Sequence, residues 1–180
     1  MLIGIAGTLG AGKGTVVAYL KEKGFVHYSA SGVLREMLRA DGLEETRENM
    51  TVLADKLRSE NPASPQHVLF EKYQTQQPDK AIIESIHSVG EADFLKARGA
   101  IILGVDADLE VRYSRIHTRG TSKDNVTFEE FKAIAIHEEE GGGKHNIRAV
   151  LDMADYTIMN NGAVAELHEK VVDILTNIEK

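Results

Sequence analysis

The chain has 180 residues, of which 42% are hydrophobic and 27% charged, so it fits one ordinary globular domain and excludes disordered and fibrous architectures. It contains no cysteine, which excludes a disulfide framework, a thiolate metal site and a cysteine nucleophile. A formal net charge of −7 argues against a surface for polyanionic nucleic acid, whereas a small anionic substrate needs only a local basic pocket.

The first element is a short apolar run, Leu2 to Ala6, typical of a strand buried on both faces. This end lacks the basic region and longer apolar stretch of a signal peptide, and no later apolar run reaches membrane-spanning length. We therefore expect a cytoplasmic protein. A glycine-rich loop and a helix from Thr15 to Lys23 follow the strand.

Strands and helices alternate along the rest of the chain. Further strands are predicted at Phe25–Ser29, Ala81–Glu84, Ala100–Val105 and Tyr156–Met159. Further helices are predicted at Gly32–Ala40, Glu44–Ser59, Val68–Gln74 and Ala92–Ala97, from Asp108 to near Arg119, and at Val164–Ile178. Because parallel strands need helix-length crossovers, this order predicts a single α/β domain with three α/β/α layers and a central parallel sheet of about five strands.

The loop after the first strand, Gly7–Thr15 (GTLGAGKGT), matches the P-loop pattern, with its hydroxyl residue one place later than usual. Such a loop presents backbone N–H groups and a helix N-terminus to phosphate oxygens. The predicted ATP-binding residues are Gly7, Gly10, Ala11, Gly12, Lys13, Gly14 and Thr15. Lys13 would reach the β and γ phosphates, and Thr15 would ligate Mg²⁺. A glycine turn without a ligand is the alternative, but the lysine, the hydroxyl and the strand-to-helix context favour phosphate binding.

The segment Gly12–Thr15 resembles the adenylate kinase version of this loop. The next segment, His27–Arg35 (HYSASGVLR), resembles the one by which nucleoside monophosphate kinases hold their phosphate acceptor. This resemblance implies that Ser31 and Arg35 face the acceptor phosphate, within an acceptor-binding segment at about 29–62. Arginine suits that task because its guanidinium binds phosphate in bidentate fashion. A solvated helix arginine is the alternative for Arg35.

A second resemblance covers nearly the whole chain. Its features are Gly42–Asn49, Arg119-Gly120, Ala154–Ile158 and Asn160–Gly162, which are similar to uncharacterised P-loop kinases of archaea and some bacteria described as dephospho-CoA-kinase-like or nucleoside-monophosphate-kinase-like. It implies a P-loop kinase fold with a small lid. Arg47 is a further candidate for the acceptor, although neighbouring glutamates offer it local ion pairs.

The helix that ends near Arg119 resembles the one leading into the lid of adenylate kinases. The resemblance implies that Arg115 lies against the donor base or ribose, that Arg119 approaches the donor phosphates, and that both help catalysis. For Arg112 we prefer a solvated, solubilising role. The lid is expected at about 120–146, where a polar helical segment ends in three glycines; an exposed loop without gating is the alternative. Arg148, just beyond, is a candidate cation on closure.

The end of the Ala81 strand carries Glu84 and His87, where relatives have an aspartate and an arginine. Glu84 is suited to holding Mg²⁺ through water and is a candidate catalytic residue. His87 would contact the acceptor phosphate best when protonated, so acceptor binding should weaken as pH rises, unless His87 is packed only for shape.

Other chemistries find less support. His137 and His145 lack the spacing of a two-histidine zinc helix and are interpreted as solvated lid residues, and Asp106 and Asp108 as caps of the next helix. The sequence thus predicts an ATP- and Mg²⁺-dependent kinase whose partner is a small phosphate acceptor, with no membrane or nucleic acid. A nucleoside monophosphate is the favoured acceptor; dephospho-CoA, and a nucleotide-dependent binding protein or slow ATPase, are the alternatives.

Overall fold

A single sheet forms the centre of the computed structural model, which describes residues 1–119, 126–140 and 145–179. Its strands are β1 (Leu2–Gly7), β2 (Val26–Ser29), β3 (Ala81–Ile86), β4 (Ile101–Asp106) and β5 (Tyr156–Met159). They are all parallel and lie in the order β2-β3-β1-β4-β5. The predicted parallel sheet of about five strands is confirmed, and the carboxyl ends of all five strands meet at one edge.

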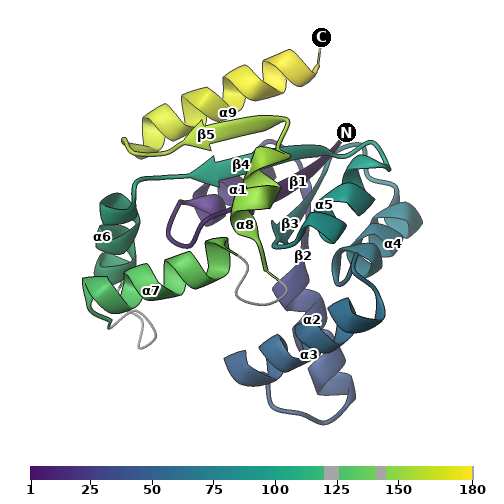
Figure 1. The fold of residues 1–180 in the computed structure, drawn as a ribbon. Helices are drawn as coiled ribbons and strands as arrows, with labels where there is room; N and C mark the ends of the chain where they lie inside the picture. The colour runs from purple at the N-terminus through teal and green to yellow at the C-terminus, as the bar shows by residue number, and fades with distance from the viewer. Residues whose placement is uncertain (120–125, 141–144, 180) are drawn as a thin grey trace.

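Helices cover both faces of this sheet, as Figure 1 shows. They are α1 (Lys13–Glu22), α2 (Ala30–Ala40), α3 (Arg47–Glu60), α4 (Gln66–Gln76), α5 (Val89–Lys96), α6 (Leu109–Arg119), α7 (Phe128–Glu139), α8 (Ile147–Asp152) and α9 (Val164–Ile178). One apolar core joins α1 and α9 to the sheet through Leu20, Leu167 and Val171. A second core joins α4, α5 and α8 to the other face. These layers confirm the three-layer α/β/α prediction.

Two helix pairs extend beyond the layers at the carboxyl edge of the sheet. In Figure 1, α2 and α3 project below the sheet, and α6 and α7 lie to its left. The members of each pair pack against each other. The carboxyl edge of the sheet is therefore flanked by two helix pairs, α2 with α3 and α6 with α7.

Helix starts differ from the predicted ones because side chains cap them. The hydroxyl of Ser29 accepts the Gly32 amide at 3.3 Å, so α2 begins earlier than predicted. Ser88 and Glu91 form a reciprocal capping box that starts α5 at Val89. The short helix α8 was not predicted at all. Among the described residues, no helix combines the length and apolarity that crossing a bilayer requires.

Candidate functional site

The phosphate loop connects the end of β1 to the start of α1 at the carboxyl edge. Gly10 and Gly12 adopt φ values of +81° and +101°, which side chains disfavour. A Cβ on Gly10 would lie 2.8 Å from the carbonyl oxygen of Arg112, and one on Gly12 would lie 2.5 Å from Nδ2 of Asn160. Glycine is thus required at both positions by conformation and by space. The amides of Thr15 and Val16 donate to the carbonyl oxygen of Gly12, which closes the first turn of α1, so the N-terminus of this helix points into the loop and favours an anion.

Lys13 projects back over this loop. Its Nζ donates hydrogen bonds to the carbonyl oxygens of Gly7 and Thr8, both at 2.8 Å. Burial lowers the pKa of Lys13 to about 8, although Glu138 and Glu84 counteract this shift. Lys13 and Thr15 line a pocket of about 670 Å³. A cation, helix amides and a hydroxyl therefore converge on one cavity.

Glu84 lies on β3 beside this loop, in register with Ile5 of β1. Its Oε1 accepts a hydrogen bond from Ser29 at 3.0 Å, and its Oε2 lies 3.3 Å from Nε2 of His27. Burial opposes ionisation of Glu84, but contacts with His27 and Ser29 and the charge of Lys13 outweigh it and lower the pKa of the carboxyl group. Glu84 is consequently a carboxylate at neutral pH.

A β-bulge follows Glu84. The pairing between β1 and β3 shifts by one residue here, so that Ser85 has no partner. Ser85 has a φ of +67°, an unusual value for a residue with a side chain, and its carbonyl oxygen accepts a 2.7 Å hydrogen bond from Gln66. Bulges redirect the side chains next to them. The sequence offered no glycine to signal this one.

Asp106, at the end of β4, holds the loop from the other side. Its Oδ1 accepts hydrogen bonds from the Thr8 hydroxyl at 2.7 Å and the Ala107 amide at 2.9 Å, and its Oδ2 lies 3.0 Å from Nη1 of Arg148. The interpretation of Asp106 as a cap of the following helix is therefore wrong, because its carboxylate is engaged by the phosphate loop and by α8.

The sequence interpretation of Arg112 is also wrong. We expected a solvated side chain, yet the residue is only 5% exposed. Its Nη1 donates to Glu139 of α7 at 2.8 Å, and Glu139 also binds Arg148. Glu139 thus ties α6 and α8 to α7, beside the phosphate loop.

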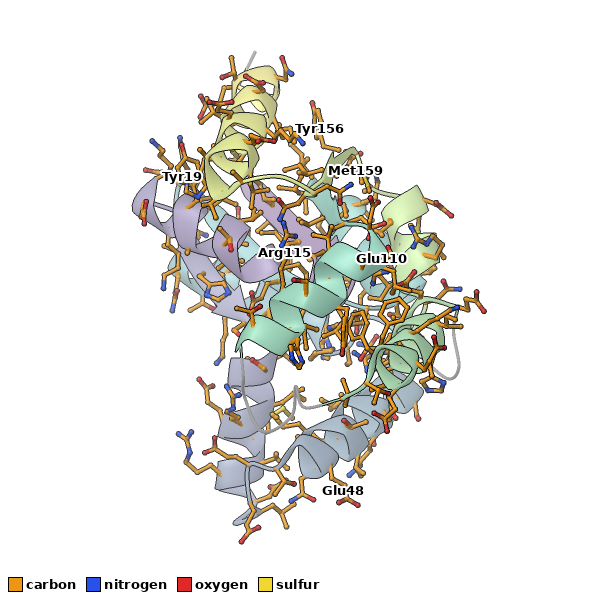
Figure 2. All side chains as sticks on the ribbon, turned by 90° about the vertical axis from the view of Figure 1, so that its left-hand side faces the viewer. Tyr19, Glu48, Glu110, Arg115, Tyr156 and Met159 are labelled. Carbon is orange, nitrogen blue, oxygen red and sulfur yellow. The ribbon has the colours of Figure 1, made fainter. Side chains whose placement is uncertain are left out.

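Arg115 lies on α6 and lines the phosphate pocket. Its Nη1 donates to the carbonyl oxygen of Asn160 at 2.8 Å, and its Nη2 to that of Gly162 at 3.3 Å. Asn160 in turn donates its side-chain amide to Ala11 at 2.8 Å. Figure 2 shows Arg115 near the centre of the molecule, whereas Glu48, near the start of α3, lies at the bottom of the view. Arg115 therefore connects α6 with the phosphate loop and the residues after β5.

A second pocket opens between α2, α3 and the end of β3. Ser31 and His87, both proposed from the sequence as acceptor residues, line it. Arg35 instead lies 3.7 Å from a carboxylate oxygen of Glu45, with 46% of its side chain exposed. Burial lowers the pKa of His87 well below its usual range, and the charges of Lys13, His145 and Arg58 add to the effect. His87 is therefore neutral at physiological pH, in contrast to the protonated form that the sequence led us to consider.

Arg58 is the main residue of this pocket that the sequence did not indicate. It is buried on α3, and its Nε donates to Oε1 of Glu91 at 2.8 Å, although Glu91 lies 33 residues further along the chain. Its Nη1 lies 3.0 Å from Nε2 of His145. The interpretation of His145 as a solvated lid residue is wrong, because it is half-buried in this contact; His137 is exposed, as expected.

Some expected site features lie outside the described residues. These are residues 120–125 and 141–144 of the lid, together with the side chains of Arg47 and Arg119. The helix α7 occupies the middle of the expected lid segment. In the described part of the chain, no cluster of three or more histidine or carboxylate side chains could hold a metal directly. Glu84 and Thr15 fit a magnesium ion that is bound chiefly by phosphate and water oxygens.

Comparison with known proteins agrees with this geometry. The sequence profile of a family described as an AAA domain matches residues 3–138, which is more than half of the chain. The chain belongs to this AAA-domain family. Two similar proteins are the UPF0200 proteins of Pyrobaculum aerophilum (28% identical; 98% of this chain and 98% of the relative) and Hyperthermus butylicus (29%; 99% and 95%).

Solved structures with the same fold as this AAA-domain protein include several kinases. A shikimate kinase from Bacteroides thetaiotaomicron aligns with a TM-score of 0.64 at 12% identity, covering 98% of both chains. A dephospho-CoA kinase from Campylobacter jejuni aligns at 0.58 and 16% identity, covering 98% of this chain and 96% of its own. A deoxyadenosine kinase from M. mycoides aligns at 0.58 and 18% identity, covering 98% and 100%. The fold is that of the P-loop kinases.

Proposed function

We propose that this protein is an ATP-dependent kinase that phosphorylates a nucleoside monophosphate. The observation that carries the proposal is the pair of pockets at the carboxyl edge of the sheet, one formed by the phosphate loop and the other between α2 and α3. Glu84 pairs with Ile5 of β1 beside the phosphate loop, and His87, three residues further on, lines the second pocket, so the end of β3 lies next to both pockets. A donor and an acceptor bound there would meet beside Glu84.

The donor pocket suits the phosphates of ATP. Gly7, Gly10, Ala11, Gly12 and Gly14, in the loop and the first turn of α1, are the candidate backbone contacts of these phosphates. Lys13 would exchange its two carbonyl acceptors for the β and γ phosphates.

The Thr15 hydroxyl and, through water, Glu84 would hold Mg²⁺ on the donor side. The ion would supply positive charge against the β and γ phosphate oxygens. Glu84 is supported in this role by its ionised state, by the hydrogen bond from Ser29 to its Oε1 and by His27, whose Nε2 lies 3.3 Å from its Oε2.

On the acceptor side, Ser31, Arg35, Arg47 and His87 are the candidate contacts. An oxygen of the acceptor phosphate attacks the γ phosphorus, the bond from that phosphorus to the β–γ bridging oxygen breaks, and ADP leaves with the bridging oxygen. Arg115 and Arg119 help to neutralise the charge of the transferred group.

We assign the domain an acceptor-binding segment at about 29–62 and a lid at about 120–146. Their support is the position of α2 with α3 and of α7, which form separate parts at the carboxyl edge of the sheet. Closure of the lid would exclude water from the transfer.

The test is a screen for ADP formation from ATP and Mg²⁺ with a panel of nucleoside monophosphates, and with dephospho-CoA in parallel. Lys13→Met should abolish transfer with the fold retained, because the change removes the cation on the donor phosphates. Lys21→Met, an exposed lysine of the same helix, is the matched control and should keep full activity. Phosphorylation of dephospho-CoA alone would replace the proposed acceptor, and ADP formation without any acceptor would indicate an ATPase.

A further inference from the structure

The pocket between α2 and α3 is small. It is a half-open pocket of about 170 Å³, and an apolar cavity of about 150 Å³ accommodates one benzene molecule. Its apolar walls are Ala30, Leu34, Met50, Ala54 and Pro65. The walls thus surround about one six-membered ring, and the second ring of a purine would extend through the open side.

The positive charge of the Arg58 guanidinium in this pocket is largely compensated by neighbouring carboxylates. Arg58 is paired at 2.8 Å with Glu91, whose side chain is completely buried, and a carboxylate oxygen of Asp55 lies 3.6 Å from it. A guanidinium that is already neutralised in this way has a weak preference for an anionic ligand. A ring that bears a carboxylate gains little here.

The imidazole of His145 is also neutral, and its tautomer follows from its partner. Arginine has no acceptor, so the 3.0 Å contact from Nη1 of Arg58 requires a lone pair on Nε2 of His145. The proton of His145 therefore lies on Nδ1. Burial and the charge of Arg58 lower its pKa, which agrees with this assignment.

His87 completes the polar side of the pocket. Its ring lies 5.2 Å from that of His145, centroid to centroid, and burial keeps it neutral. A neutral imidazole offers one N–H donor and one acceptor nitrogen. Together with Ser85, which also lines the pocket, the histidines offer hydrogen bonds without net charge.

We propose that this pocket binds the ring of a pyrimidine nucleotide, so that the acceptor is a pyrimidine nucleoside monophosphate and not a purine one. The proposal rests on the proposed kinase function and names its substrate class. One neutral six-membered ring with both carbonyl and N–H groups matches the volume, the apolar walls and the uncharged donors and acceptors. A purine would have to leave its second ring outside the walls.

The experiment measures binding and turnover separately for CMP, UMP, dTMP, AMP and GMP. We expect kcat/KM for at least one pyrimidine nucleotide to exceed that for both purines by roughly tenfold or more, the scale on which pocket size discriminates substrates. Met50→Ala enlarges the pocket and should reduce this preference by improving the purines. Val52→Ala truncates an apolar residue of the same helix that is 63% exposed and does not line the pocket, so it should leave the preference unchanged.

Calorimetry without turnover tests the pocket assignment separately from the kinase proposal. If pyrimidine nucleotides bind more tightly than purines but no ADP forms with any acceptor, the kinase proposal fails and the pocket assignment stands. If ADP forms equally well or better with purines, the kinase proposal stands and the pocket assignment is overturned. Absence of binding by all five nucleotides, or an unchanged preference in Met50→Ala, also overturns the pocket assignment.

Discussion

Replacing Glu91 by glutamine should destabilise the protein strongly, because the buried guanidinium of Arg58 then loses its carboxylate partner at 2.8 Å. The side chain of Glu91 is 0% exposed and that of Arg58 is 5% exposed. Glutamine preserves the shape and still accepts the His87 amide, which donates to Glu91 at 2.7 Å. What it removes is the negative charge. Breaking a buried pair in this way costs about 3–5 kcal/mol of unfolding free energy.

The pair itself contributes less than this figure implies. Burial raises the pKa of Glu91, although Arg58 and the amides of His87 and Ser88 act in the opposite direction. The ionised carboxylate is therefore less favourable in the fold than in water. The cost of Glu91→Gln arises from the charge left behind, and removing both charges should be less harmful than removing one.

Urea denaturation of four proteins tests this reasoning: the wild type, Glu91→Gln, Arg58→Met and the double variant. The double variant should be more stable than Glu91→Gln alone. Since its raised pKa lets Glu91 become protonated in the fold, the stability deficit of Arg58→Met should shrink as pH falls toward that pKa. Glu36→Gln is the control, because this 60% exposed partner of Lys72 should cost less than about 1 kcal/mol. If the two single losses simply add in the double variant, the pair is not coupled and the reasoning is refuted.

Three further predictions concern the two pockets. Thr15→Ala should raise the Mg²⁺ concentration needed for half-maximal activity more than it lowers stability, and equal Mg²⁺ titrations of both proteins would contradict the ligand role. Arg35→Ala should raise the acceptor KM or lower kcat while ATP affinity in calorimetry stays the same; an equal loss of ATP binding would assign Arg35 to the donor side or to structure. Because Lys13 has a pKa of about 8 and only its charged form attracts phosphate, ATP affinity should fall by about tenfold between pH 7 and pH 9, and a flat profile would exclude this dependence.

The strands of the sheet could be predicted from the sequence because each one has a recognisable residue pattern of its own. Continuous apolar runs such as Leu2 to Ala6 indicate strands buried on both faces, and the glycines around Lys13 require a tight turn into a helix. The helix α8 escaped prediction because six residues give too little periodicity to recognise. Local sequence patterns thus identified the strands and the helix after the phosphate loop, because each of these elements has its signal within one short segment.

The pocket between α2 and α3 was harder to predict because its contacts join distant segments. Arg58 and Glu91 are each unremarkable in sequence, and only the packing of α3 near the start of α5 brings them together. No glycine in the sequence indicates the bulge at Ser85, yet the bulge determines the direction of the side chains after Glu84. Arg112 resembled a surface residue because its partner, Glu139, lies on a different helix.

One positive charge links the chemistry of the two pockets. Burial alone would favour the neutral form of both Glu84 and His87, and the charge of Lys13 acts on each with an opposite outcome. At Glu84 it joins His27 and Ser29 in overcoming burial, and the carboxyl group stays ionised. At His87 it adds to burial, and the imidazole stays neutral. The lysine that is proposed to face the donor phosphates therefore favours a charged group where magnesium is proposed to bind and an uncharged ring where the base is proposed to bind.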